Sequence, residues 1–266
     1  MFQIFKEHRH KWRQILLLAQ TELRKTYKGA LLGIGWALVK PLLTLFVYWF
    51  AFEFGIRAGG STGGVSRFTF MLVGFVPWFF MSDAILMGSK SIRANKQYVV
   101  KMKFPVSTIV TFTLISRLYV HFMLLVPMFA YLWLTGFPPT VYMLQLPIYM
   151  VLMFVFFEAL TWSTATMSAF SMDFLNLVNS IMTCLFWLSG ILWDASSMGI
   201  KWLKYLMYAN PITYVVDSYR YSLIYNKWFF IESPARTALF LAELVAVSLL
   251  GMYNYKRLRK QLPDVL

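Results

Sequence analysis

Residues 118–157 read LYVHFMLLVPMFAYLWLTGFPPTVYMLQLPIYMVLMFVFF and contain no Asp, Glu, Lys or Arg. A helix that crosses the hydrocarbon core of a bilayer needs about 20 mostly apolar residues, and this stretch is long enough for two. Gly136-Phe137-Pro138-Pro139 marks a tight turn within it, because Gly and Pro end regular structure. The stretch therefore predicts two membrane-spanning helices joined by a short turn.

Apolar runs of the same kind lie on both sides of this stretch. The chain of 266 residues is 59% hydrophobic, with a mean hydropathy of +0.60, whereas soluble domains are about 45–50% apolar. The predicted fold class is an all-α membrane protein, with a transmembrane domain over 31–256 and a cytoplasmic tail over 257–266. We expect six transmembrane spans, at about 33–54, 68–89, 107–134, 141–170, 175–193 and 236–255.

The first 30 residues do not have the composition of a span. Apolar residues such as Trp12, Leu16 and Ala19 recur at helical spacing among Lys and Arg residues, which gives an amphipathic helix with a basic face. Such a helix suits the membrane interface, so we predict a cytoplasmic interfacial helix over 1–30. The alternative is a solvated helix that packs on a partner domain. The segment is too charged for a cleavable signal peptide.

The segment 198–228 is rich in aromatic residues but too polar to span. Pro211 follows Asn210, and proline cannot continue a helix, so we expect two short helices. This hairpin would dip into the outer leaflet or lie on it, because protein or water must cover any non-helical backbone at depth. The alternative is an ordinary surface loop with two interfacial helices.

The net charge of +14 would indicate a nucleic-acid partner in a soluble protein, but here the Lys and Arg residues lie between apolar runs. With the N-terminus inside the cell, the predicted inner segments carry 16 of the 25 Lys and Arg residues and the outer segments carry six. Basic residues favour the cytoplasmic side. We therefore predict a multi-pass protein of the bacterial cytoplasmic membrane with both termini inside, and no nucleic-acid partner.

The sequence lacks the signals of a nucleotide-binding or metal-binding enzyme. It contains no G-x-x-x-x-G-K-[ST] phosphate loop, and the histidines His8, His10 and His121 are too scattered for a metal site. The single Cys184 lies in an apolar run and is interpreted as a small buried residue. We expect no catalytic residue, no metal and no cofactor on this chain.

Charged residues inside predicted spans are costly and therefore informative. Asp83, Arg117 and Glu158 fall in one depth band when each residue contributes about 1.5 Å of helical rise. We expect Arg117 to pair with Glu158 or with Asp83. The pair is either structural, holding helices together, or part of a polar lining that contacts an anionic substrate.

The inner loop at 93–105 mixes basic and apolar residues. Exposed Tyr, Val, Met and Phe side chains between lysines are unusual for a linker, and they suit a short helix docked in a groove of a cytoplasmic partner. The alternative is an interfacial turn that lies on lipid. The candidate contact residues are Lys96, Tyr98, Val99, Lys101, Met102 and Phe104.

Several motifs occur in order along nearly the whole chain. They are Tyr27-x5-Gly33-x2-Trp36-x4-Pro41, Gly74-Phe75-Val76-Pro77-Trp78-Phe79-Phe80, Val100-Lys101-Met102-Lys103-Phe104-Pro105 and Asn210-Pro211-Ile212-x-Tyr214-x4-Tyr219-Arg220. In these motifs the chain resembles the permease subunits of type-2 ABC exporters, in the polysaccharide and polyol-phosphate export group. Two stretches resemble the wall-teichoic-acid translocation permeases most: Tyr48-Trp49-Phe50-x-Phe52-x2-Gly55-Ile56-Arg57 and Lys101-Met102-Lys103-Phe104-Pro105-Val106-Ser107.

The resemblance implies a dimer of this chain with two separate ATPase subunits, which would bind ATP and Mg. It also implies that the 93–105 loop is a coupling helix on the ATPase, that the 198–228 hairpin is an outer gate, and that spans one and five line a conduit. The candidate gate residues are Asn210, Pro211, Asp217 and Arg220, and the candidate conduit residues are Trp36, Lys40, Arg117, Glu158 and Trp187. Aromatic rings stack on sugars; their alternative role is a lipid-facing belt.

The leading expectation is export of a lipid-linked anionic glycopolymer, wall teichoic acid, by a permease that contacts membrane lipid and makes no bonds itself. The alternatives within this class are export of O-antigen, capsular polysaccharide or a small amphipathic drug. An integral membrane enzyme acting on lipid-linked sugars would need clustered acids or a His and Asp set, and the sequence shows none. A proton-coupled carrier would in most cases show inverted repeats, and the two halves show no such likeness.

Overall fold

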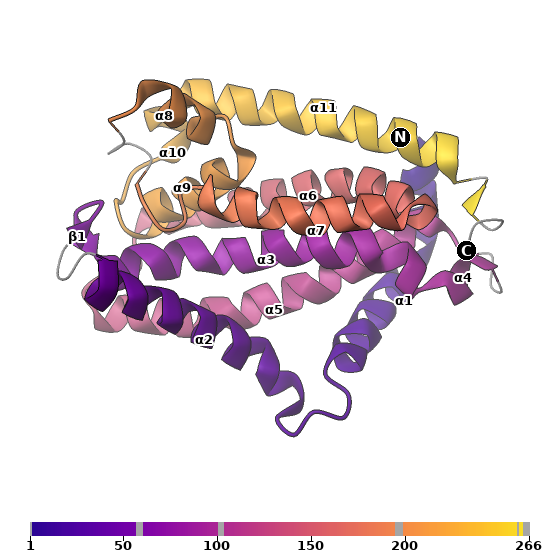
Figure 1. Ribbon diagram of the computed structural model, residues 1–266, viewed down its shortest axis with the longest axis horizontal. Helices are drawn as coiled ribbons and strands as arrows, with labels where there is room; N and C mark the ends of the chain where they lie inside the picture. Colours follow the sequence, from indigo (N-terminus) through magenta and orange to yellow (C-terminus); the bar gives the residue numbers. More distant parts are fainter. Residues whose placement is uncertain (1, 57–60, 101–103, 195–198, 260, 263–266) are drawn as a thin grey trace.

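The computed structural model describes residues 2–56, 61–100, 104–194, 199–259 and 261–262, which form a bundle of helices (Figure 1). The long helices are α1 (Phe2–Thr26), α2 (Trp36–Phe50), α3 (Arg67–Ala94), α5 (Val106–Leu134), α6 (Leu146–Phe170), α7 (Met172–Trp187) and α11 (Pro234–Leu258). The short helices are α4 (Lys96–Val100), α8 (Lys201–Tyr208), α9 (Pro211–Leu223) and α10 (Phe229–Glu232). The predicted all-α membrane class is confirmed.

Short elements join these helices. The 3-10 turns η1 (Gly33–Gly35) and η3 (Val141–Gln145) precede α2 and α6, and the π-helical turn η2 (Ala51–Ile56) extends α2. In the described ranges the only strands are β1 (Ser61–Thr62) and β2 (Val65–Ser66), an antiparallel hairpin before α3. Ser66 caps α3 by accepting a hydrogen bond from the backbone N–H of Thr69 at 3.2 Å, which satisfies one unpaired donor of the first turn.

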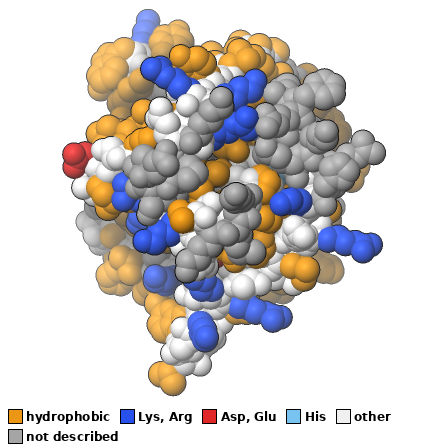
Figure 2. All heavy atoms as spheres, turned by 90° about the vertical axis from the view of Figure 1, so that its right-hand side faces the viewer, with side chains coloured by type: hydrophobic (Ala, Val, Ile, Leu, Met, Phe, Trp, Pro, Cys, Tyr) orange, Lys and Arg blue, Asp and Glu red, His pale blue; other side chains and the backbone are white. Residues whose placement is uncertain are grey.

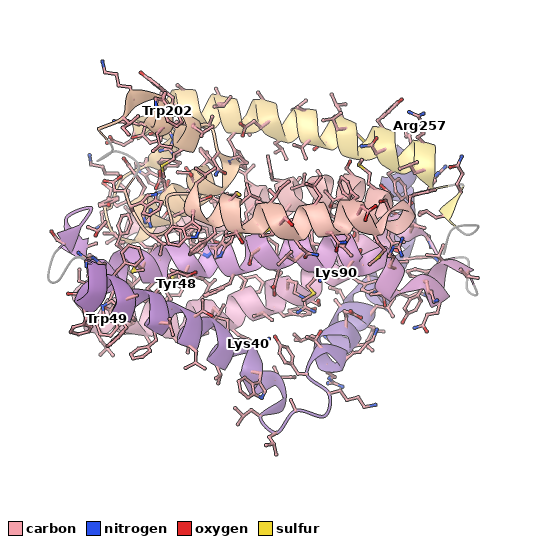
Figure 3. All side chains as sticks on the ribbon, viewed as in Figure 1. Lys40, Tyr48, Trp49, Lys90, Trp202 and Arg257 are labelled. Carbon is pink, nitrogen blue, oxygen red and sulfur yellow. The ribbon has the colours of Figure 1, made fainter. Side chains whose placement is uncertain are left out.

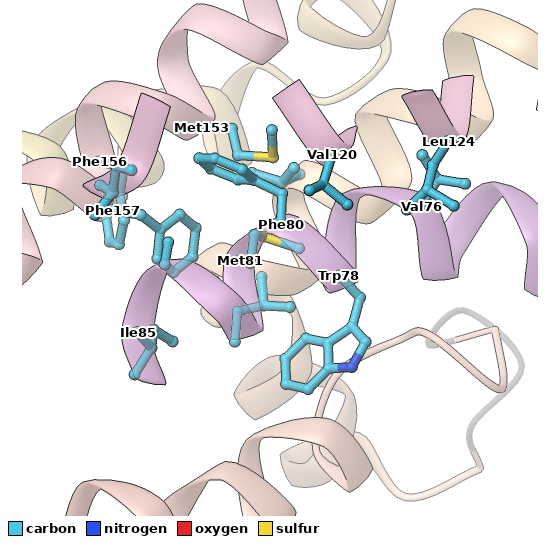
Figure 4. Packing of buried hydrophobic residues seen from close by; sticks show 14 of the residues in the cluster. Val76, Trp78, Phe80, Met81, Ile85, Val120, Leu124, Met153, Phe156 and Phe157 are labelled. Atoms are coloured by element: carbon cyan, nitrogen blue, oxygen red, sulfur yellow. The ribbon is translucent and has the colours of Figure 1, made fainter. Parts of the chain in front are cut away.

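Helix α3 lies at the centre and packs against α5, α6, α7 and α9. In the most apolar stretches of α3 and α5, 72% of the residues are buried, against 11% in the segment of α2 and 17% in α11. Figure 4 shows the packing around Phe80, Met81 and Ile85 of α3, with Met153 and Phe157 of α6 nearby. Helices α2 and α11 therefore flank the bundle and turn most of their apolar surface outward.

Five segments are long and apolar enough to cross a membrane: Gly33–Gly55, Arg67–Ala94, Val106–Leu134, Val141–Phe170 and Pro234–Leu258. They correspond to five of the six predicted spans. The predicted span at 175–193 corresponds to α7, which has 16 residues and ends at Trp187. Figure 1 shows α7 running lengthwise beside α3 and α6, although a span ordinarily needs about 20 residues. The sixth crossing stays a prediction.

The N-terminal helix α1 packs along α5. Ile15, Ala19 and Leu23 form its buried stripe. Ala19 belongs to the predicted apolar pattern, and the position of this helix in the membrane interface stays a prediction. Trp12 continues this stripe but is 51% exposed, because it lines a groove between α5 and α6 instead of a closed contact.

The two ends of the bundle differ. The start of α1, the end of α11 and α4 lie at one end, whereas α8, α9 and the β-hairpin lie at the other (Figure 1). Figure 2 shows Lys and Arg side chains gathered on the end that carries α4. This is the arrangement expected if that end faces the cytoplasm, and the orientation stays a prediction.

Candidate functional site

A cavity of about 580 Å³ opens where the end of α1, the start of α2 and the middle of α3 and α5 meet. Three of the predicted conduit residues, Trp36, Lys40 and Arg117, lie in its wall. The other polar residues that line it are Thr26, Tyr27, Thr44, Asp83 and His121. The structure thus brings together residues from four elements that are distant in the sequence.

Arg117 is the most deeply buried charge of this cavity, with 4% of its surface exposed. Its Nη1 lies 3.9 Å from Asp83 Oδ2, and its Nη2 donates to Thr26 Oγ1 at 2.8 Å. Its Nε has no hydrogen-bond partner among the described residues. Of the two partners expected for Arg117, the structure selects Asp83. The pair joins α5 to α3, and Thr26 fastens the end of α1 to it.

Trp36 and Lys40 enter the cavity from the start of α2. They stand at positions i and i+4 and therefore share one helix face. Figure 3 shows Lys40 near the start of α2, with Tyr48 and Trp49 near its other end. Lys40 is exposed, and within the described ranges it forms no ion pair. Its ammonium group is therefore available to an acceptor that enters the cavity.

Tyr27 lies next to the Arg117–Asp83 pair, outside the spans. Partial burial raises the pKa of its hydroxyl, an effect that Arg117 opposes and Asp83 supports. The hydroxyl therefore stays protonated at neutral pH and can donate a hydrogen bond. The cavity as a whole offers two cations, one carboxylate and an aromatic wall, which suits hydroxyl and carboxylate groups of a ligand.

His121 closes the cavity toward the bundle centre. It is 1% exposed, its Nδ1 lies 3.3 Å from the backbone oxygen of Val76, and its Nε2 lies 2.9 Å from Tyr219 Oη. The imidazole therefore links α5 to α3 and α9. Thr113, one helical turn before Arg117 on α5, donates to the backbone oxygen of Ile109 at 2.9 Å.

The other two predicted conduit residues lie elsewhere. Glu158 lines an apolar groove between α5 and α6, where the hydroxyl of Thr111 donates to its Oε1 at 2.5 Å. Trp187 lies at the end of α7, 40% exposed, with its ring centroid 5.6 Å from those of Phe186 and Trp193. The five predicted conduit residues therefore occupy three separate places.

The predicted gate residues form a network at the opposite end from α4. Arg220 is 1% exposed, and its Cζ lies 3.4 Å from the centroid of the Phe70 ring. The guanidinium donates to the backbone oxygens of Gly190, of Ile191 at 2.9 Å and of Phe70 at 3.2 Å. Arg220 thus ties α9 to the start of α3 and to the turn after α7.

Asp217 extends this network. It lies 3.4 Å from Arg220 Nη1 and accepts a hydrogen bond from Arg236 Nη2 at 2.8 Å, which joins α9 to α11. Asn210 caps α9 by accepting from the backbone N–H two residues later at 2.9 Å. Pro211 takes the first helical position, where its missing N–H is harmless. Two short helices, α8 and α9, lie on either side of Asn210-Pro211. The predicted outer-leaflet hairpin and its role as a gate stay predictions.

The predicted coupling loop contains the short helix α4, as expected. Its apolar side chains are less exposed than predicted. Val99 is 5% exposed. The centroid of the Tyr98 ring lies 6.0 Å from the centroid of the Phe104 ring and 6.0 Å from that of the Phe112 ring. Lys11 Nζ of α1 lies 4.3 Å from the Phe104 centroid. Tyr98 and Phe104 are only partly exposed and face Phe112 and Lys11, and Val99 is buried, so the expected exposure is not seen at these three side chains. The docking of this loop on a partner stays a prediction.

Part of the loop does face outward. Val100 is 49% exposed and Lys96 is exposed. Arg93 fixes the base of the loop by donating to the backbone oxygens of Ser168 at 2.7 Å and Ala169 at 2.9 Å. The remaining predicted contact residues, Lys101 and Met102, lie outside the described residues.

Three residues of the cavity and its surroundings had no role in the sequence prediction. Thr26 gave no signal, because its partner Arg117 lies on another helix, 91 positions along the chain. Tyr219 was visible only as a member of a motif, and its partner His121 is 98 positions away. Tyr27 was likewise visible only as a member of a motif. Among the described residues, no group of three or more His, Cys, Asp or Glu could hold a metal ion.

Known proteins are similar to this chain over most of its length. Residues 13–224 match the model of the family described as ABC-2 type transporter. The O-antigen export system permease protein RfbA of Myxococcus xanthus is 27% identical over 215 residues, which cover 79% of this chain and 80% of that protein. The protein of the same name from Klebsiella pneumoniae is 23% identical over 209 residues, which cover 77% and 78%. With its bundle of apolar helices, the chain belongs to the ABC-2 type transporter family of multi-pass membrane permeases.

Proposed function

We propose that this chain is the permease of an ATP-driven exporter that moves a lipid-linked polysaccharide of the O-antigen type across the cytoplasmic membrane. The observation that carries the proposal is the family match over residues 13–224 together with two relatives named as O-antigen export permeases. Both alignments cover more than three quarters of this chain, so the likeness is not limited to one helix or one loop.

Wall teichoic acid, the leading expectation from the sequence, receives no support from these relatives, because neither is named for it. The cavity also favours a sugar polymer. Asp83 lies beside Arg117 and offsets part of its positive charge, so the wall is a weak attractor for a polymer with a negative charge on every unit. Trp36 offers a ring on which a sugar face can stack.

In this proposal the permease makes no covalent bond; it lowers the barrier for a polar polymer to cross hydrocarbon. Trp36, Tyr27 and Lys40 contact the polymer, through ring stacking and through donors to hydroxyl or carboxylate oxygens. Arg117 is already engaged by Asp83 and Thr26. We therefore assign Arg117 to holding the wall in shape.

The energy comes from two separate ATPase subunits that bind ATP and Mg, as the family implies. We propose that they dock at the end that carries α4, where Lys96 and Val100 are exposed and Lys and Arg residues gather. This places the predicted gate network around Arg220 at the outer end.

A second copy of the chain completes the conduit in this proposal. Helix α2 turns a continuous apolar face away from the bundle, and a partner copy would cover it. The exposed residues of that face are Leu42, Leu43, Phe46, Val47 and Phe50.

Depletion of the chain in cells that continue to make the polymer tests the proposal. Export-competent cells carry the polymer at the surface, whereas depleted cells are expected to accumulate it on its lipid carrier, out of reach of added glycosidases until the membrane is permeabilised. Chemical analysis of the accumulated polymer distinguishes the substrates. Sugars without a polyol-phosphate backbone support the proposal, a polyol phosphate points to teichoic acid, and unchanged surface polymer contradicts export by this chain.

A further inference from the structure

A second groove opens between α5 and α6 on the flank of the bundle, separate from the cavity at Arg117. It encloses about 960 Å³, and Leu118, Phe122, Val151 and Phe154 form much of its apolar wall. Phe122 and Val151 are 46% and 62% exposed. The groove therefore opens outward, along two helices that are long and apolar enough to lie in hydrocarbon.

One end of this groove is polar. Glu158 and His8 line it there, the Thr111 hydroxyl donates to Glu158 Oε1 at 2.5 Å, and His8 Nε2 lies 2.7 Å from the same hydroxyl. Trp162 lines the same end, and its buried indole N–H has no hydrogen-bond partner among the described residues. An apolar groove with one polar end has the distribution of polarity that suits an amphiphilic ligand, with a polar headgroup and an apolar chain.

The length of the groove indicates what its apolar part can hold. At about 1.5 Å of rise per residue, the wall from Thr111 to Phe122 is about 16 Å long and the wall from Pro147 to Trp162 about 22 Å. One leaflet of the hydrocarbon core is about 15 Å thick. An acyl chain that starts at the level of Glu158 can therefore lie in the groove over the full depth of a leaflet.

The charge at the polar end indicates the headgroup. A carboxylate has acceptor capacity beyond the one bond that Glu158 receives from Thr111, and it attracts a cation while opposing an anion. We propose that this groove binds one phospholipid with a primary ammonium headgroup, with an acyl chain between α5 and α6 and the ammonium group on Glu158.

Such a lipid would be a bound component of the permease. It would fill the gap between α5 and α6 beside Trp12 of α1, and no step of polymer export passes through it. The site is therefore independent of the cavity that contains Lys40 and Arg117.

Lipid competition on the purified full-length chain tests this proposal. Delipidated protein is offered equal amounts of phosphatidylethanolamine and phosphatidylglycerol with the same acyl chains, and bound lipid is counted by native mass spectrometry. We expect one phosphatidylethanolamine per chain, preferred about tenfold, which corresponds to about 1.4 kcal/mol. Glu158→Gln is expected to abolish the preference. Glu243→Gln removes an acid from α11, outside the groove, and is expected to retain it.

A second pair of variants tests the acyl-chain position. Leu118→Trp fills the groove and is expected to lose lipid binding, whereas Leu241→Trp on the exposed side of α11 is expected to keep it. Thermal unfolding shows which variants are folded, and Val151→Trp replaces Leu118→Trp if the latter is not. Equal binding of phosphatidylglycerol or of a polyprenyl phosphate, or an unchanged preference in Glu158→Gln, would overturn the proposal.

Discussion

Arg117 and Asp83 face each other between α5 and α3, with Nη1 and Oδ2 3.9 Å apart, but the two partners differ in exposure. The Arg117 side chain is 5% exposed and that of Asp83 is 38% exposed. Water in the cavity can therefore hydrate the carboxylate if its partner is removed, whereas it reaches the guanidinium poorly. Single substitutions of Arg117 and of Asp83 are therefore expected to lower the stability of the permease by different amounts.

Asp83→Ala is expected to lower the stability of the purified permease more than Arg117→Met does. Removing the acid leaves a buried cation without its partner, a loss of about 1–3 kcal/mol, whereas removing the cation leaves a hydrated carboxylate. The double variant should recover much of the loss of Asp83→Ala, because an apolar side chain of similar length is acceptable in place of a buried charge. Thermal unfolding in detergent measures all three. A larger loss for Arg117→Met than for Asp83→Ala would refute this account.

Lys40→Ala is expected to leave thermal stability unchanged and to reduce export several-fold. The ammonium group is exposed and forms no ion pair in the described ranges, so its loss breaks no internal contact. Lys40→Arg should retain most export because it keeps the charge. Lys28→Ala is the matched control, an exposed lysine outside the cavity. Surface polymer per cell, at equal permease level, is the measurement; full export by Lys40→Ala would remove Lys40 from the polymer path.

Val99 and Val100 are adjacent but face different surroundings, at 5% and 49% exposure. Val100→Asp is expected to weaken co-purification of the ATPase subunit and to leave the folded permease intact. Val99→Asp should instead reduce the amount of folded permease, because it places a charge in the buried hydrophobic cluster. Pull-down of tagged ATPase, normalised to folded permease by size-exclusion chromatography, separates the two effects. Normal ATPase binding by Val100→Asp would move the docking surface away from α4.

The helices of this protein are predictable from the sequence because length and apolar composition are local properties. The partner of Arg117 is not, because Asp83 and Glu158 fall at similar depth and only helix rotation decides between them. That rotation is set by close packing: a Cβ on Gly88 would lie 2.5 Å from Thr161 Cγ2, so α3 and α6 touch along that face. A glycine at such a contact gives no distinctive signal in one sequence.

The loop at 93–105 shows the same limit. Its short helix follows from local sequence, but the inward turn of Tyr98 and Phe104 depends on Lys11 and Phe112, which belong to other helices. The break at Asn210-Pro211 is the opposite case. Proline acts on its own backbone, so the sequence alone is sufficient to place it.

Arg220→Lys is expected to destabilise the permease although it conserves the charge. The planar guanidinium donates to three backbone oxygens and stacks on Phe70, and a lysine cannot reproduce that fork. A loss of about 2–3 kcal/mol is expected from the buried carbonyl groups that are left unpaired. Lys204→Arg on α8 is a control at the same end of the bundle. An unchanged melting temperature for Arg220→Lys would show that the carbonyl contacts contribute little.

Gly251→Ala has two effects of opposite sign on the stability of the permease. Alanine favours the interior of a helix over glycine by about 1 kcal/mol, which would stabilise α11. A Cβ at this position, however, would press against the backbone oxygen of Ala159 and lie 3.3 Å from its carbonyl carbon. Backbone atoms of α6 cannot move aside as a flexible side chain can. The overpacking cost of about 1–3 kcal/mol is therefore expected to exceed the gain in helix propensity, and the variant should be less stable.

The neighbouring contact makes this outcome measurable. Asn254 Nδ2 donates to Ser163 Oγ at 2.6 Å across the same pair of helices, and a shift of α11 away from α6 would break that bond. Gly251→Ala and Asn254→Ala should therefore be less than additive in a thermal-unfolding cycle. Gly199→Ala, where an added Cβ meets nothing within 4 Å, controls for the change of residue type. A melting temperature raised by Gly251→Ala would mean that α11 is less tightly seated on α6 than its packing implies.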